Sequence, residues 1–313
     1  MYIHLHWHSH YSLLEAIGKV PKIIDKAKEL GFPAIGITDY HGMYGIMEFY
    51  TKATKYGIKP ICGIELTISH ILGKKPDQEQ FIVLIAKNYT GYKNLMKLTT
   101  IANTKGMDIV PTLDGQTLEQ YHEGLICVLG GPRSLLARWI DSIKAAEPIE
   151  TISKEIAQYQ RLFGSDLYLE VIAQDYTLEP SLKALNNQII LLWKHFQLPI
   201  IVSSNFHYVA PSDRLAFETA LAIKDQRLMT DPNRRKLLGE YHIMSEEQVH
   251  TILTKNWYSE EQIGIRFDTN QSVSDTIALE LPKPIAKFPL YKTSQEFAEL
   301  YEKTKDGLVL SSK

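Results

Sequence analysis

Several features that mark common protein classes are scarce in this sequence. Only two cysteines, Cys62 and Cys127, occur among 313 residues, and no paired spacing suggests a disulfide framework or a thiolate zinc site. No apolar run approaches the roughly 18–20 residues that cross a bilayer, and the first residues do not resemble a signal peptide. We therefore expect a protein of the reducing cytoplasm with no membrane partner.

An excess of one charge is also missing. The chain has 34 basic and 36 acidic residues and a formal net charge of -2, so the whole chain carries no basic signature for nucleic acid. The short cationic run Arg234–Lys236 is a candidate phosphate contact, although such runs are more often solvated turns. Composition alone neither indicates nor excludes nucleic acid as a partner.

Two sequence motifs of common enzymes are absent. No glycine-rich phosphate loop follows the first expected strand, which removes the usual reason to predict a dinucleotide-binding sheet. No Gly-x-Ser-x-Gly elbow is present, which argues against a serine nucleophile.

Short apolar runs alternate with segments of helical periodicity. Seven strands are predicted, at Tyr2–His8, Ala34–Thr38, Pro60–Ile68, Phe81–Ala86, Leu125–Leu129, Leu167–Ile172 and Pro199–Ser204. Helices are predicted at Val20–Leu30, Met43–Tyr56, Tyr92–Asn103, Arg133–Ala146, Ile152–Phe163, Ser181–Phe196 and Pro211–Lys224. This alternation favours parallel pairing with right-handed crossovers, and hence an α/β fold with a seven-stranded (β/α) barrel; an open doubly wound sheet is the alternative.

The rhythm changes after residue 231. Further helices are predicted at Ser245–Lys255, Ser259–Ile265 and near Gln271–Leu279. The stretch Leu281–Lys292 contains three prolines and no periodicity, so it is interpreted as a linker, followed by an amphipathic helix at Ser294–Leu308. We therefore expect a barrel domain over residues 1–280 and a linker with a helical extension over residues 281–313.

Four of the eleven histidines stand at alternate positions at the very start, at His4, His6, His8 and His10. On an extended strand, alternate side chains share one face, and imidazole nitrogens two residues apart can both reach one metal ion. Ligation is expected mainly of His6 and His8, because hydrogen-bonded structural histidines remain the alternative for the other two.

Other polar residues stand at the expected strands or at their ends, where barrel enzymes place their chemistry. They are Thr38–His41, Glu65, Glu170 and Asn205–Tyr208. Each residue alone is weak evidence for a catalytic site, since a single aspartate after a strand more often forms a turn. Together they describe a hydrolytic centre in which a divalent ion activates water and polarises a phosphoryl oxygen.

At these residues the sequence resembles the polymerase and histidinol phosphatase (PHP) domain family, and within it the N-terminal PHP domains of bacterial DNA polymerase III alpha subunits. The resemblance runs through His6–Ser9 with Tyr11–Leu14, Thr38–Asp39 with Gly45–Tyr50, Gly57–Ile61 with Gly63 and Glu65, Ala86–Asn88 with Gly91–Leu95, Asn205–Tyr208 and Thr230–Asn233. It covers essentially the whole chain. It implies a distorted seven-stranded barrel that binds divalent zinc or manganese.

The departures from the family pattern are as informative as the matches. The resemblance implies ligands at four positions that hold Tyr40, Phe81, Gly131 and Asn205, with His41 one residue late. Ligands retained by the same comparison are His6, His8, Glu15, Glu65 and His207. These ligands would hold one metal ion or none, which predicts a degenerate site with weak or no activity.

The resemblance also sets expectations about the parent protein. It implies a structural scaffold within a DNA polymerase III holoenzyme, which contacts DNA through the full-length subunit, and relatives with an intact cluster resemble 3'-5' exonucleases. Polymerase chemistry needs a palm domain, which is not contained in the sequence up to Lys313. The alternative is a free-standing PHP phosphatase of the histidinol-phosphatase type that acts on a small phosphoester; no catalytic residue is assigned in either case.

Overall fold

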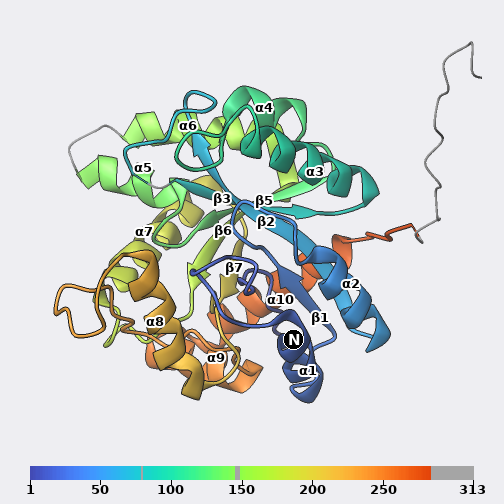
Figure 1. Cartoon of the computed structure of the whole chain (residues 1–313). Coiled ribbons are helices and arrows are strands. Elements are labelled where there is room, and N and C mark those ends of the chain that lie inside the picture. The colour runs from blue at the N-terminus through green and yellow to red at the C-terminus, as the bar shows by residue number, and fades with distance from the viewer. Residues whose placement is uncertain (79, 145–148, 283–313) are drawn as a thin grey trace, which may run out of the picture. The chain divides into compact units, whose positions relative to one another are not determined.

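Short strands of Ile, Val and Leu form the centre of the molecule, because their unbroken apolar runs require burial on both faces. The computed structural model describes residues 1–78, 80–144 and 149–282, and it arranges the strands in one curved sheet (Figure 1). The strands are β1 (Ala34–Ile37), β2 (Lys59–Ser69), β3 (Phe81–Ala86), β4 (Thr112–Asp114), β5 (Leu125–Gly130), β6 (Leu167–Ile172) and β7 (Ile200–Ser203). Six of these seven strands, all but the short β4, were predicted.

The sheet follows the order β1-β2-β3-β5-β6-β7, with β4 paired to β2 off this path. Neighbours β1 and β2, β2 and β4, β5 and β6, and β6 and β7 are parallel, whereas β3 is antiparallel to both β2 and β5. The prediction of parallel pairing throughout is therefore wrong at β3. In the described part of the connection between β2 and β3, residues 70–78 and 80, there is no helix to carry the chain back across the sheet. So short a connection favours reversal over a parallel crossover.

The N-terminal segment Tyr2–His8 lies beside β1 and next to the residues that follow β7. The N–H of Gly36 donates to the carbonyl oxygen of His4 (2.6 Å), and the N–H of His8 donates to the carbonyl oxygen of Phe206 (3.1 Å). Because these bonds are divided between two neighbours, the segment forms an isolated bridge instead of the predicted strand. It links the two ends of the sheet, which confirms a distorted barrel of the predicted class.

Ten α-helices are found among the described residues, and Figure 1 shows them around the outside of the sheet. They are α1 (Val20–Glu29), α2 (Ile46–Lys55), α3 (Tyr89–Asn103), α4 (Gly115–Gln120), α5 (Leu135–Lys144), α6 (Ile149–Phe163), α7 (Pro180–Phe196), α8 (Arg214–Lys224), α9 (Glu246–Lys255) and α10 (Glu260–Thr276). Single 3-10 turns occupy Gly164–Asp166 and Pro211–Asp213. Within the described ranges no helix has the length and apolar character needed to cross a membrane.

Two helix predictions need correction. The six-residue α4 was not predicted, and α10 is one helix where two shorter ones were expected. Polar Asn270 and Ser274 interrupt the apolar pattern of α10, yet both are buried in the structure. A buried polar residue breaks a hydrophobic periodicity without breaking the helix, because its partners are supplied from other parts of the chain.

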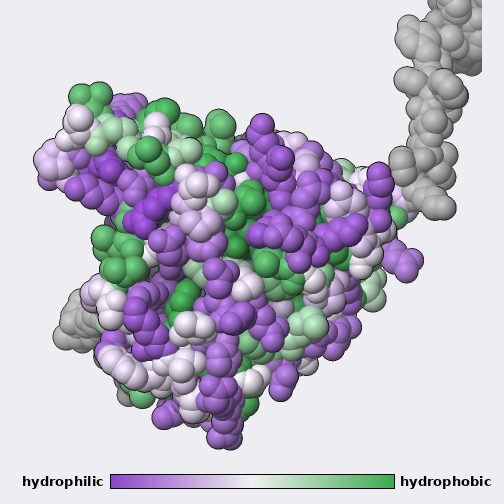
Figure 2. All heavy atoms as spheres, turned by 90° about the horizontal axis from the view of Figure 1, so that it is seen from below, coloured by the Kyte–Doolittle hydropathy of each residue, from purple (hydrophilic) through white to green (hydrophobic). Residues whose placement is uncertain are grey.

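Chain contacts divide the protein into Met1–Glu280 and Leu281–Lys313. The first unit contains every helix and strand named above. Its face shown in Figure 2 is mostly hydrophilic with scattered apolar side chains. The predicted helix at Ser294–Leu308 lies outside the described residues.

Asn270 connects α10 to the end of the sheet that the N-terminal segment closes. Its side chain is fully buried, its amide nitrogen donates to the carbonyl oxygens of Ile3 (2.8 Å) and Val202 (2.7 Å), and its Oδ1 accepts from the N–H of Val202 (3.0 Å). One side chain thus satisfies backbone groups of β7 and of the segment that carries His6 and His8.

We expect Asn270→Ala to destabilise the protein by about 2–4 kcal/mol, because it leaves buried backbone groups without partners. Urea unfolding monitored by circular dichroism measures the loss. Ser272→Ala, at an exposed position of the same helix, serves as the control with a change below about 0.5 kcal/mol. Equal stability of the two variants would contradict the closing role of Asn270.

Candidate metal centre

The N-terminal segment carries the first two candidate ligands into the barrel. His6 and His8 are two residues apart on extended backbone, and their side chains are 2% and 0% exposed. Their ring centroids lie 5.2 Å apart. The pairing predicted from the alternate histidines is therefore present in the structure.

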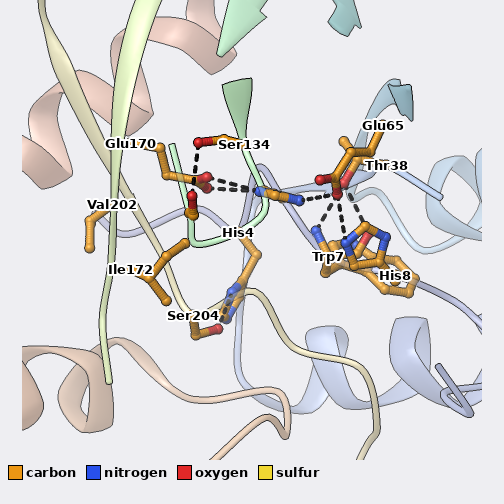
Figure 3. A network of polar contacts seen from close by, with 12 residues as sticks. His4, Trp7, His8, Thr38, Glu65, Ser134, Glu170, Ile172, Val202 and Ser204 are labelled. Carbon is orange, nitrogen blue, oxygen red and sulfur yellow. Dashed lines mark hydrogen bonds and ion pairs between the residues drawn. The ribbon is translucent and has the colours of Figure 1, made fainter. Parts of the chain in front are cut away.

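Glu65 of β2 meets both imidazoles with one carboxylate oxygen. The Oε2 atom lies 2.9 Å from Nε2 of His6 and 3.0 Å from Nε2 of His8 (Figure 3). Within the described part of the chain, these two histidines and one glutamate form a group whose ligand atoms all lie within 4.8 Å of one another. Two imidazole nitrogens and one carboxylate oxygen are a suitable donor set for zinc or manganese.

Glu170 of β6 holds the other side of the His6 ring. Its Oε1 and Oε2 atoms lie 2.9 and 3.1 Å from Nδ1 of His6, and its side chain is fully buried. Glu170 and Glu65 thus contact different nitrogens of this imidazole. A carboxylate at Nδ1 leaves Nε2 directed at Glu65, which is how metal-binding histidines are commonly oriented.

Sequence reasoning noted Glu170 on its strand but did not include it among the site residues. The signal was a glutamate inside an otherwise apolar strand, Leu167–Ile172. Such a residue needs a buried partner, but periodicity does not identify that partner as His6.

The electrostatics of this group favour a positive charge between the carboxylates. Burial alone would lower the pKa of His6, but the charges of Glu170 and Glu65 outweigh burial and raise that pKa to about 10. Burial alone would raise the pKa of Glu65, and the charge of His6 with contacts from His6 and His8 holds it well below its usual range instead. A proton on His6 or a metal ion can supply this charge, and metal binding then releases the proton.

The donor set also passes a test of fit for a metal ion. His8 is fully buried, yet neither of its ring nitrogens has a hydrogen-bond partner in the described residues. Its Nε2 atom has only the close approach to Glu65. Buried polar atoms are almost always satisfied, so a ligand position is the natural reason for this exception.

His207 lies near this group without joining it. Its ring centroid is 4.9 Å from that of His8, and its Nδ1 atom is buried without a hydrogen-bond partner in the described residues. Burial, with the charges of His8 and His6, holds the pKa of His207 well below its usual range, so the ring is neutral. Ligation by His207 stays a prediction.

Glu15 lines a cavity of about 160 Å³ together with His6 and Glu65. Its carboxylate, however, contacts cationic side chains. Its Oε1 atom lies 3.3 Å from Arg133 Nη2 and contacts Lys224 Nζ, and its Oε2 atom lies 3.5 Å from Arg235 Nη1. Glu15 is thus not brought to His6 and His8. Metal binding by Glu15 stays a prediction, and its carboxylate forms ion pairs with Arg133, Lys224 and Arg235.

Aromatic side chains lie beside His8, next to the strand that carries Glu65. Tyr40 stacks on His8 with ring centroids 3.9 Å apart and an interplanar angle of 7°. Phe81 packs against Tyr40 at 5.3 Å and against His41 at 5.5 Å. His41 therefore lies beside Phe81, and it is outside the group formed by His6, His8 and Glu65.

Two further candidates, His4 and Asp39, have structural partners. Nε2 of His4 donates to the carbonyl oxygen of Met244 (2.8 Å), and burial lowers the pKa of His4 to about 4, so it is a neutral hydrogen-bonded residue. Asp39 accepts from the backbone and hydroxyl of Ser9 and from the hydroxyl of Ser12. His4 and Asp39 therefore have structural roles, which was the alternative to metal binding for both residues.

We expect Glu170→Gln to weaken Zn²⁺ or Mn²⁺ binding about 10- to 100-fold, because it removes the charge that orients His6. Competition with a fluorescent chelator measures the affinity, and circular dichroism checks folding. Glu119→Gln is the matched control, since the side chain of Glu119 is 61% exposed and pairs with Arg161. Wild-type affinity in the Glu170 variant would contradict an orienting role.

Comparisons with known proteins show which family this chain is similar to. The PHP domain model matches residues 4–174. The chain is 35% identical over 255 residues to the DNA polymerase III subunit alpha of Borreliella burgdorferi, covering 79% of this chain and 22% of that protein. It is 29% identical over 307 residues to the subunit of the same name from Treponema pallidum, covering 95% of this chain and 25% of that protein.

Among solved structures, an amidohydrolase from Chromobacterium violaceum is similar with a TM-score of 0.44 and 14% identity, over 66% of this chain and 88% of that one. The chain spans about a quarter of the length of the two curated relatives. The family model covers more than half of the 313 residues. This chain therefore belongs to the PHP domain family.

Proposed function

We propose that this chain is the PHP domain of a bacterial replicative DNA polymerase III alpha subunit, whose parent protein synthesises DNA during chromosome replication. Within that protein the domain acts as a structural scaffold with a degenerate metal-dependent phosphoesterase site of the 3'-5' exonuclease type. Support comes from two relatives of that name, which align over 79% and 95% of this chain. Other parts of the holoenzyme, and DNA through the full-length subunit, are its proposed partners in the cytoplasm.

The proposal of a degenerate site rests on the small number of clustered ligand residues. In the described residues, His6, His8 and Glu65 alone have clustered ligand atoms. They suit one zinc or manganese ion, with His207 as a further candidate ligand. When bound, such an ion lowers the pKa of a water molecule and polarises a phosphoryl oxygen.

The surrounding residues would orient and limit that centre. Glu170 fixes the ring of His6, and Tyr40 covers the face of His8. The Arg133 guanidinium lies 5.0 Å from the Tyr40 ring centroid and supplies positive charge at the same wall. An aromatic ring face and a guanidinium group do not serve as ligands for a second ion, so turnover is expected to be weak or absent.

Purified protein with Mn²⁺ or Zn²⁺ should bind about one ion and show no robust hydrolysis of a 3'-labelled oligonucleotide or of histidinol phosphate. His8→Ala should lower metal affinity at least about 10-fold, because it removes a ligand nitrogen. His250→Ala is the control, since His250 is exposed on α9 and pairs with Glu260. Plasma mass spectrometry gives the metal content.

Robust metal-dependent hydrolysis of either substrate that is abolished by His8→Ala would contradict the scaffold proposal. Preference for the small phosphoester would then favour the free-standing phosphatase. Reading the encoding DNA past the codon for Lys313 separates the two proposals independently, because only the polymerase predicts an open frame with palm carboxylates.

A further inference from the structure

Arg133 has an unusual position at the wall of the candidate metal centre. It follows Gly131 in the turn between β5 and α5, where Gly131 has a φ of +80° that favours glycine. The side chain is 30% exposed. Its guanidinium carbon lies 5.0 Å from the ring centroid of Tyr40 and 4.9 Å from that of Phe81.

These contacts extend a stack that begins at a candidate ligand. The Tyr40 ring lies on the His8 ring at 3.9 Å, and Arg133 lies beside Tyr40. The space next to His8 on the Tyr40 side is therefore filled by an aromatic ring and then by a fixed positive charge. Guanidinium groups pack on aromatic faces without losing that charge.

Glu15 gives this charge a buried partner. The carboxylate is 8% exposed, and Arg133 Nη2 approaches its Oε1 atom at 3.3 Å. Lys224 and Arg235 contact the same carboxylate. A carboxylate taken out of water requires compensating positive charge, and here side chains provide it where a divalent ion would also serve.

We infer that Arg133 is a built-in cation that takes the place of a second divalent ion and thereby restricts the centre to one. It shares a cavity with His6 and Glu65 and engages Glu15, the second carboxylate that lines this cavity. Like charges repel, so an added ion beside Arg133 is disfavoured. The inference rests on the proposed function in assigning the first ion to His6, His8 and Glu65.

The test combines metal titration with a double-mutant cycle. Wild-type protein should bind at most one Mn²⁺ per chain, and Glu15→Gln should keep both that stoichiometry and the affinity within about 3-fold. In EDTA, Arg133→Met should lower the Tm by about 3–6 °C, because it leaves Glu15 with less compensating charge. Glu15→Gln/Arg133→Met should recover part of this loss, because charge and partner are removed together.

Arg161→Met is the control, since the Arg161 side chain is 76% exposed and pairs with Glu119; it should shift the Tm by less than about 1 °C. Two or more Mn²⁺ ions bound per wild-type chain would overturn the inference, as would a 10-fold loss of affinity in Glu15→Gln. Additive Tm changes in the cycle would also overturn it. If neither the wild-type protein nor any variant binds Mn²⁺, the proposed metal site is wrong. The double-mutant cycle of Glu15 and Arg133 then decides by itself whether Arg133 compensates the charge of Glu15.

Discussion

The need to compensate buried carboxylates governs this molecule. The side chains of Glu65, Glu170 and Glu15 are 8%, 0% and 8% exposed. Each would cost several kcal/mol to bury as an unpaired ion. The surrounding side chains can be understood as the sources of positive charge that make this burial possible.

Two different sources supply this charge. Glu65 and Glu170 share His6, which lies between them and contacts both through its two ring nitrogens. Glu15 instead meets Arg133, Lys224 and Arg235, which come from the β5–α5 turn, from α8 and from the loop after it. One half of the cavity thus keeps an arrangement that suits a metal ion, and the other half contains permanent cations.

Much of this arrangement could be predicted from the sequence. The alternate histidines and the glutamate inside β2 identified His6, His8 and Glu65, because residue type and period-two spacing are local properties. The barrel class followed from alternating strands and helices. The direction of β3 did not follow, because an antiparallel strand with both faces buried has the same apolar pattern as a parallel one.

Contacts between distant segments were beyond such reasoning. Glu170 faces His6 across 164 residues of chain, and Lys224 reaches Glu15 across 209. Only the register of the barrel brings them together, so neither the contact of Glu170 with His6 nor the contact of Lys224 with Glu15 was predicted. The extended segment Tyr2–His8 was predicted as a strand because side-chain alternation does not report how its backbone bonds are shared.

Anomalous diffraction from crystals grown with Mn²⁺, recorded on both sides of the manganese absorption edge, tests the account most directly. It locates each ion independently of any activity. The account predicts a single anomalous peak in contact with His6, His8 and Glu65, and an Arg133 guanidinium still paired with Glu15. A second peak bound by Glu15, or the absence of any peak at the two histidines while manganese is bound elsewhere, would contradict it.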